Sequence, residues 1–150
     1  MKAEVAKRPD EQDHRALALW AADCAEHVLP CFEAHCPEDD RPRKAIEAGR
    51  AWVRGEIKCG KARDAAVAAH AAARSTDHPA ARDAARAAAT AHMAAHARHA
   101  AAYAVKAVTL SADAETSAVI ERDRQYRCLP EHLRPMVFPS GKSYTSPGQK

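Results

Sequence analysis

The sequence predicts an all-α protein, a compact antiparallel bundle of five to six helices. No segment shows the alternation of polar and β-branched residues that is typical of a half-buried strand. Apolar residues instead recur at helical spacing, and most of them are alanine. Short segments that contain proline or glycine separate the helical stretches. Because short connections make successive helices antiparallel neighbours, these features together favour a closed bundle.

We expect the first helix to begin near Asp10 or Asp13, because either side chain can cap free backbone N–H groups. Pro30 should kink or break it and leave one more turn through His35, since proline has no amide hydrogen to donate. One apolar stripe runs along this helix and predicts its buried face. The stripe consists of Leu17, Trp20, Cys24, Val28 and Cys31.

The other helices follow from alanine-rich stretches between turn residues. Asp39 or Asp40 should cap the second helix, and Gly60 should end it. The fourth helix is expected to run unbroken across the whole domain, starting after Pro79. The expected helices cover residues 14–29, 43–57, 61–75, 80–108, 114–127 and 131–134.

The chain divides into three parts by composition. Residues 1–12 are polar and contain a proline, which predicts a flexible leader. Residues 13–138 form the helical bundle domain, and this length suffices to bury a core without disulfides. Residues 139–150 are rich in serine, glycine, lysine and proline, which predicts a mobile tail.

Composition and charge argue against several functional classes. The formal net charge is only +3 and acids alternate with bases, whereas a nucleic-acid binder usually carries a concentrated basic stripe with aromatic residues beside it. The five cysteines are an odd number and no apolar leader precedes them, which argues against a secreted disulfide framework. No segment approaches the roughly 20 apolar residues that span a bilayer. We therefore expect a cytoplasmic protein that binds neither nucleic acid nor membrane.

The two tryptophans are expected to be core anchors that hold the first two helices together. Trp20 lies on the apolar stripe of the first helix, and Trp52 lies one residue from the apolar face of the second. Aromatic side chains are scarce at 5% of the chain, so each of them contributes a large share of the buried area.

Large polar side chains on otherwise apolar helix faces are the candidate site residues. Asp23 is expected to pair with Arg50, or failing that with Arg74, because a carboxylate beside the core stripe needs a partner. Such pairs more often lock helices together than catalyse a reaction. Cys24 is a conceivable nucleophile, although a cysteine on an apolar stripe usually only packs. The candidate set is Asp23, Glu26, Arg43, Arg50, His70, Arg74, His92, His96 and Tyr103.

The histidines allow two interpretations. His92 and His96 are one helical turn apart, and with His70 they could bind a divalent metal ion. However, the glutamate that follows the first histidine of a zinc-protease helix is absent, and the cysteines form no closely spaced ligand pair. The alternative is a network of buried hydrogen bonds that fixes the register of alanine-rich helices. Under either interpretation the three histidines should converge near the middle of the bundle.

Several motifs resemble those of a bacterial family of immunity proteins from polymorphic toxin systems. The likeness covers about residues 14–138. It implies a small helical protein that binds and neutralises a cognate toxin and has no cofactor of its own. The motifs are Trp20-Ala-Ala-Asp-Cys-Ala-Glu26, Asp39-Asp-Arg-Pro-Arg43, Ala45-Ile-Glu-Ala-Gly-Arg-Ala-Trp52, Ala69-His-Ala-Ala-Ala-Arg74, Ala91-His-Met-Ala-Ala-His96 with Tyr103, and Leu129-Pro-Glu-His-Leu-Arg134.

The leading hypothesis is a cytoplasmic immunity protein that masks a protein partner. The alternative is a helical metal- or small-ligand-binding protein, with enzyme activity left open, built on His70, His92, His96 and Asp23. A third hypothesis is a purely structural interaction module. The sequence contains no complete nucleophile–base pair and no phosphate-binding loop, and it does not determine the oligomeric state.

Overall fold

The computed structural model describes residues 10–92, 94–111 and 114–138, and its described part is all-α, which confirms the predicted fold class. The expected leader lies almost wholly outside this part and the expected tail lies wholly outside it. The elements are α1 (Glu11–Glu33), α2 (Arg41–Val53), α3 (Cys59–Arg74), α4 (Pro79–Thr90), η1 (Ala94–His96), α5 (Ala97–Ser111), α6 (Ala114–Cys128), η2 (Glu131–Leu133) and α7 (Arg134–Val137).

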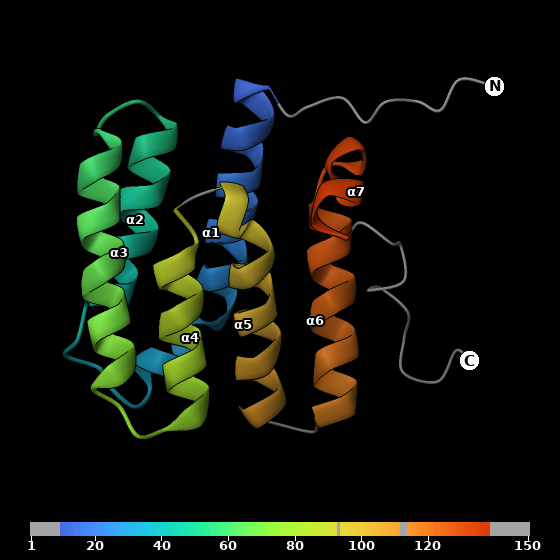
Figure 1. The fold of residues 1–150 in the computed structure, drawn as a ribbon. Coiled ribbons are helices and arrows are strands. Elements are labelled where there is room, and N and C mark those ends of the chain that lie inside the picture. Colours follow the sequence, from blue (N-terminus) through green and yellow to red (C-terminus); the bar gives the residue numbers. More distant parts are fainter. Residues whose placement is uncertain (1–9, 93, 112–113, 139–150) are drawn as a thin grey trace.

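The helices run alternately up and down, and α1 lies at the centre of the bundle (Figure 1). Helices α2, α4 and α5 pack against α1, while α3 covers α2 and α4. Helix α6 packs on the outer side of α5, and α7 lies at its C-terminal end. Most of the buried apolar residues are alanines, which allow these helices to approach closely but gain little free energy per side chain.

Both ends of α1 differ in one detail from the sequence expectation. Asp10 is the N-cap: its carboxylate accepts from the Asp13 amide at 2.8 Å, and the Asp13 side chain accepts from the Asp10 amide. The helix therefore begins at Glu11, two residues before the predicted domain boundary. Pro30 does not break the helix, which continues to Glu33. Proline lacks an amide donor but keeps its carbonyl, and the Ala34 amide donates to that carbonyl at 2.9 Å.

The end of α2 was placed incorrectly by the sequence analysis. Gly55, not Gly60, terminates the helix, because it adopts a φ of +77° that favours glycine. The amides of Gly55 and Glu56 bond back to the carbonyls of Trp52 and Ala51, each at 2.9 Å. This turn leaves Ile57 in the loop and places Gly60 inside α3.

The predicted fourth helix is broken into the antiparallel pair α4 and α5. An unbroken helix of 29 residues would be about 44 Å long, whereas α1 with its 23 residues is about 35 Å long. Folding back at Ala91–His96 instead buries alanines of both halves against each other and α1. The Thr90 hydroxyl donates to the Arg86 and Ala87 carbonyls at 2.9 and 3.2 Å, a local bond that competes with helix continuation.

Trp20 is buried as predicted, and its indole contacts the C-terminal part of the chain. Its indole N–H donates to the Gln125 carbonyl of α6 at 2.8 Å, and its ring meets that of Phe138 edge-on at 6.3 Å. Trp52 is partly exposed and does not belong to the main core cluster. The role of core anchor is therefore wrong for Trp52, and Trp20 connects α1 to the C-terminal part of the chain.

Candidate functional site

Four of the candidate residues form a row of ion pairs between α1 and α2. Arg50 donates to Asp23 at 2.7 Å and also contacts Glu26. Arg43 pairs with Glu33, the next acidic residue of α1 that faces α2, through Nε at 2.9 Å. The predicted pairing of Asp23 with Arg50 is confirmed, and Arg74 is not its partner. The pair lies at the surface, however, because the Asp23 side chain is 60% exposed.

Replacing Asp23 with alanine should therefore lower the free energy of unfolding by only about 0–1 kcal/mol, the usual range for an exposed ion pair. Arg50 also keeps Glu26 as a partner, so no buried charge is left alone. Thermal or urea unfolding of D23A against the wild type measures the effect. A loss of about 3 kcal/mol or more would show that the pair behaves as a buried one.

The interface between α1 and α6 contains a buried carboxylate that the sequence analysis missed. Glu121 is 2% exposed and accepts from Arg124 at 2.9 Å and from Gln125 at 2.9 Å. His27 Nδ1 of α1 lies 2.8 Å from the same carboxylate, and Gln125 also donates to the Ala101 carbonyl of α5. The sequence feature that could have revealed this carboxylate is its spacing. Glu121, Gln125 and Leu129 are four residues apart and lie on one helical stripe.

Cys24 lies next to this polar cluster but is not a nucleophile. Its side chain is 1% exposed, and burial raises the pKa of its thiol far above the usual range. A thiol that stays protonated is a poor nucleophile, so Cys24 is a packing residue.

The structure brings His70, His92 and His96 toward one another across α3, the end of α4 and η1. The rings of His92 and His96 are 6.3 Å apart, and His70 is close enough to interact electrostatically with both. No group of three or more histidine, cysteine or acidic side chains in the described residues is arranged to hold a metal ion. The metal alternative therefore has no support from this geometry.

Two of these histidines have pKa values below the ordinary histidine value. Burial lowers the pKa of His70, and the nearby Arg74 and Arg86 lower it further. Burial is also the largest cause that lowers the pKa of His92; the Ala89 carbonyl partly opposes it. By the geometric criterion for a hydrogen bond, His92 Nδ1 is shielded from solvent and has no partner among the described residues.

These shifts predict a pH dependence of stability. The unfolded chain takes up protons at an ordinary histidine pKa of about 6.5, whereas folded His70 and His92 take them up only at lower pH. Their contribution is thus complete above about pH 6.5 and is lost as the pH falls through their folded pKa. Melting temperatures measured from about pH 7.5 to about pH 5 should fall less steeply in H70Q/H92Q than in the wild type. An equal fall of melting temperature with pH in the two proteins would contradict the lowered pKa values of His70 and His92.

Positive charge gathers around Tyr103 on α5. The Arg86 guanidinium lies 5.9 Å and the Lys106 ammonium 5.4 Å from the centre of the Tyr103 ring, within cation–π range. Arg86 in turn acts on His70, which joins this cluster to α3. We call this surface the basic face. It comprises Arg63, Val67, His70 and Arg74 of α3, Arg86 of α4, His96 of η1, and Tyr103 and Lys106 of α5.

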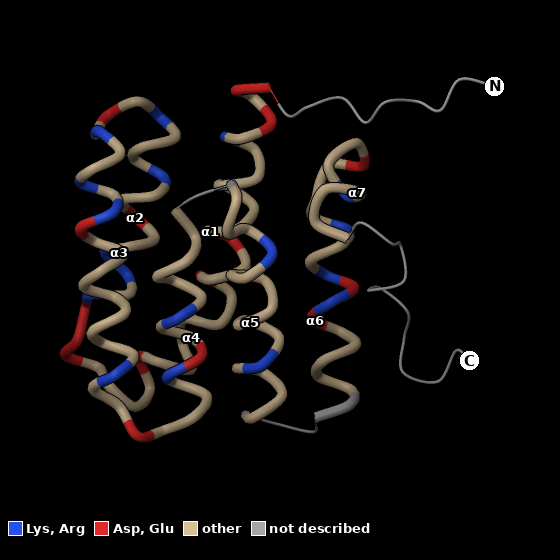
Figure 2. Tube along the Cα trace, in the orientation of Figure 1, with Lys and Arg blue, Asp and Glu red and all other residues tan. Residues whose placement is uncertain are grey.

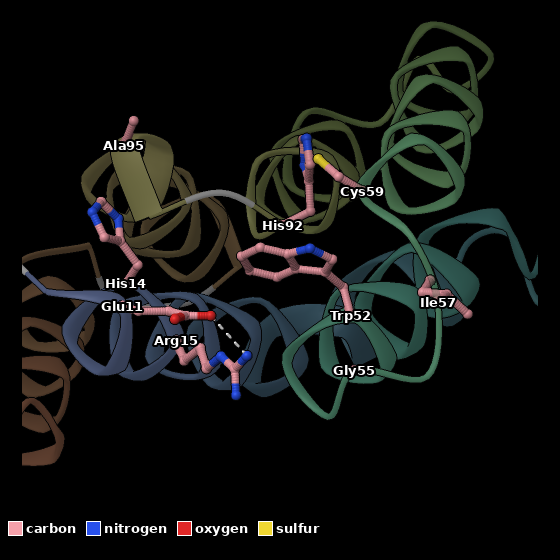
Figure 3. A pocket seen from close by; sticks show the side chains of 9 residues that line it. All are labelled: Glu11, His14, Arg15, Trp52, Gly55, Ile57, Cys59, His92 and Ala95. Carbon is pink, nitrogen blue, oxygen red and sulfur yellow. Dashed lines mark hydrogen bonds and ion pairs between the residues drawn. The ribbon is translucent and has the colours of Figure 1, made fainter.

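A pocket of about 630 Å³ lies where the N-terminus of α1 meets the C-terminus of α2 and the start of α3. The Trp52 indole extends across it; in this view His92 and Cys59 lie on one side of the ring and Glu11 and Arg15 on the other (Figure 3). Glu11 and Arg15 pair with each other at 3.0 Å. An indole beside a few titratable groups suits an apolar or aromatic group with a polar edge.

The hydroxyl groups of the described residues bond mainly to the backbone, and the candidate residues lie in two separate groups. The hydroxyls of Ser75, Thr90 and Thr109 donate to backbone carbonyls, and the Thr76 hydroxyl accepts from the His78 amide; none of these four bonds joins a hydroxyl to a histidine ring, as in an activated nucleophile. Of the candidate residues, Asp23, Glu26, Arg43 and Arg50 lie on α1–α2, whereas His70, Arg74, His96 and Tyr103 lie on the basic face. His92 lies between that face and the pocket.

Comparison with known proteins places the chain in a family. Searches of curated proteins and of solved structures gave no match. None of the helices described is long and apolar enough to cross a membrane. The family model described as "Imm-5 like putative immunity protein" matches residues 7–132, which include every candidate site residue and nearly the whole bundle. The chain belongs to the Imm-5 like immunity protein family.

Proposed function

We propose that this protein binds a toxin in the cytoplasm of the cell that makes it, and neutralises that toxin by covering its surface. Membership of the Imm-5 like family carries this proposal. The charged and aromatic surface around Tyr103 supports it, because such surfaces suit recognition of a protein partner. A binding protein of this kind needs no cofactor.

Growth of a bacterial host tests this proposal. Immunity proteins of toxin systems protect the cell that makes the toxin, so the protein encoded beside this chain is the partner to examine. Producing that neighbour alone should stop growth, and producing this chain with it should restore growth. A neighbour that does no harm, or whose toxicity this chain leaves unchanged, would contradict the proposal.

Small-ligand binding is a second candidate, and the pocket around Trp52 is the observation that favours it. A ligand retained there should be released on denaturation and detected by mass spectrometry in a stoichiometric amount. The variant W52A, which removes the largest side chain of the pocket, should carry less of it. An equal amount in W52A would place the ligand elsewhere.

A further inference from the structure

We infer that the basic face binds an acidic protein surface, and that this face is where the toxin docks. This inference rests on the proposed function, because that proposal identifies the acidic partner as the toxin. The observation behind it is a contrast between two sides of the bundle in how their positive charges are neutralised.

On the α2 side, every lysine and arginine from residue 41 to residue 54 has a carboxylate partner. Arg50 pairs with Asp23 and Glu26 of α1, and Arg43 with Glu33. The other pairs are Arg41 with Asp39, Lys44 with Asp40, and Arg54 with Glu56. The positive charges of this side are therefore neutralised by carboxylates of the same chain, and this side presents little net electrostatic field to a partner.

The α3–α5 side is different. Residues 59–111 contain seven lysines and arginines but only three aspartates, together with five of the nine histidines. Figure 2 shows where the lysines, arginines and acidic residues lie on these helices. No ion pair in the described part of the chain includes Arg63, Arg74 or Lys106, and all three are exposed. Arg86 has only a long contact of 3.4 Å with Asp83. The positive charges of this face are available to an outside partner.

The charges of the basic face also repel one another in the free protein. Burial is the largest cause that lowers the pKa of His70 and of His92, and nearby positive groups lower both further: Arg74, Arg86 and His96 act on His70, and His96, Arg63 and His70 act on His92. Carboxylates from a partner would relieve this repulsion. A complementary surface of this kind speeds association and selects the partner.

The uncharged residues of the face indicate a protein rather than a nucleic acid. Val67 is 60% exposed and shares the helical stripe of Arg63 and Arg74, which gives the face an apolar centre that a phosphate backbone would not use. Tyr103 has two cations within cation–π range and is half-buried, an environment like that of interface anchors. Proteins that bind single-stranded nucleic acid usually offer several aromatic rings for successive bases, and here Tyr103 is the one aromatic residue from 59 to 111.

The test uses poly-L-glutamate as a model acidic polypeptide and a single-stranded DNA oligonucleotide as the competing class. The double variant R74E/K106E reverses two exposed charges of the basic face. Its matched control is K44E/R127E, which lowers the net charge equally but changes exposed pairs on α2 and α6. The variant R74K/K106R keeps the charges. Melting temperatures show that all variants are folded.

We expect the wild type to bind poly-L-glutamate at low salt and to lose it at high salt. R74E/K106E should bind roughly tenfold more weakly or worse, which corresponds to about 1.4 kcal/mol. K44E/R127E and R74K/K106R should bind like the wild type. No binding by the wild type, equal weakening in the two reversed variants, or tighter binding of the DNA would each overturn the inference.

The growth assay separates this inference from the proposed function. If the wild type protects the host, R74E/K106E should not protect it and K44E/R127E should; protection by both variants would overturn the docking face. If the wild type fails to protect, the proposed function fails, whereas the poly-L-glutamate result still decides whether the face binds an acidic polypeptide.

Discussion

Replacing Trp20 with alanine is expected to lower the free energy of unfolding by about 3–5 kcal/mol. The side chain is 3% exposed, so its removal leaves a cavity between α1, α6 and α7. It also leaves the Gln125 carbonyl without the indole N–H that it accepts at 2.8 Å. Urea unfolding followed by circular dichroism measures the loss.

The matched control for this change is W52A. Trp52 is partly exposed and lines a pocket, so its removal should cost only about 1 kcal/mol, the typical effect of a point substitution. Similar losses in W20A and W52A would contradict the assignment of Trp20 to the core and of Trp52 to a binding surface.

Replacing Glu121 with alanine is expected to cost about 3 kcal/mol, at the lower end of the range for breaking a buried ion pair. The change removes the carboxylate that Arg124, Gln125 and His27 share. Arg124 and His27 are 28% and 47% exposed, so they can regain some contact with water, which keeps the cost at that lower end.

The variant E121Q distinguishes charge from packing at the same position. It keeps the size of the side chain and one oxygen acceptor, so it should be destabilised less than E121A. D23A, in which an exposed pair is lost, should be destabilised least of the three. An E121A protein as stable as D23A would show that the α1–α6 interface does not depend on the buried carboxylate.

The sequence was sufficient to predict the helices but not how some of them end. Helical spacing and capping residues correctly located α1, and proline at residue 79 correctly began α4. The break between α4 and α5 was missed because no proline or glycine marks it. The break allows the alanine-rich faces of α4 and α5 to pack against each other and against α1. This packing depends on the whole bundle and overrides local helix propensity.

The candidate residues were recognised more readily than their arrangement. Asp23 and Arg50 were paired correctly because their helices are neighbours. The position of Asp23 beside the core stripe suggested a buried pair, but the pair lies at the surface. Glu121 was missed because a glutamate in a helix rich in charges is normally exposed. Arg74 and Tyr103 share a face only because α5 folds back beside α4, so the basic face could not be seen in the predicted unbroken helix.

The most direct test of the central claim is calorimetric titration of this protein with the protein encoded beside it, inactivated by substitution. The account predicts a saturable one-to-one complex whose affinity falls as salt is added, and falls further for R74E/K106E but not for K44E/R127E. The absence of a complex would contradict the proposed function. A complex whose affinity is the same in both variants and insensitive to salt would contradict docking through the basic face.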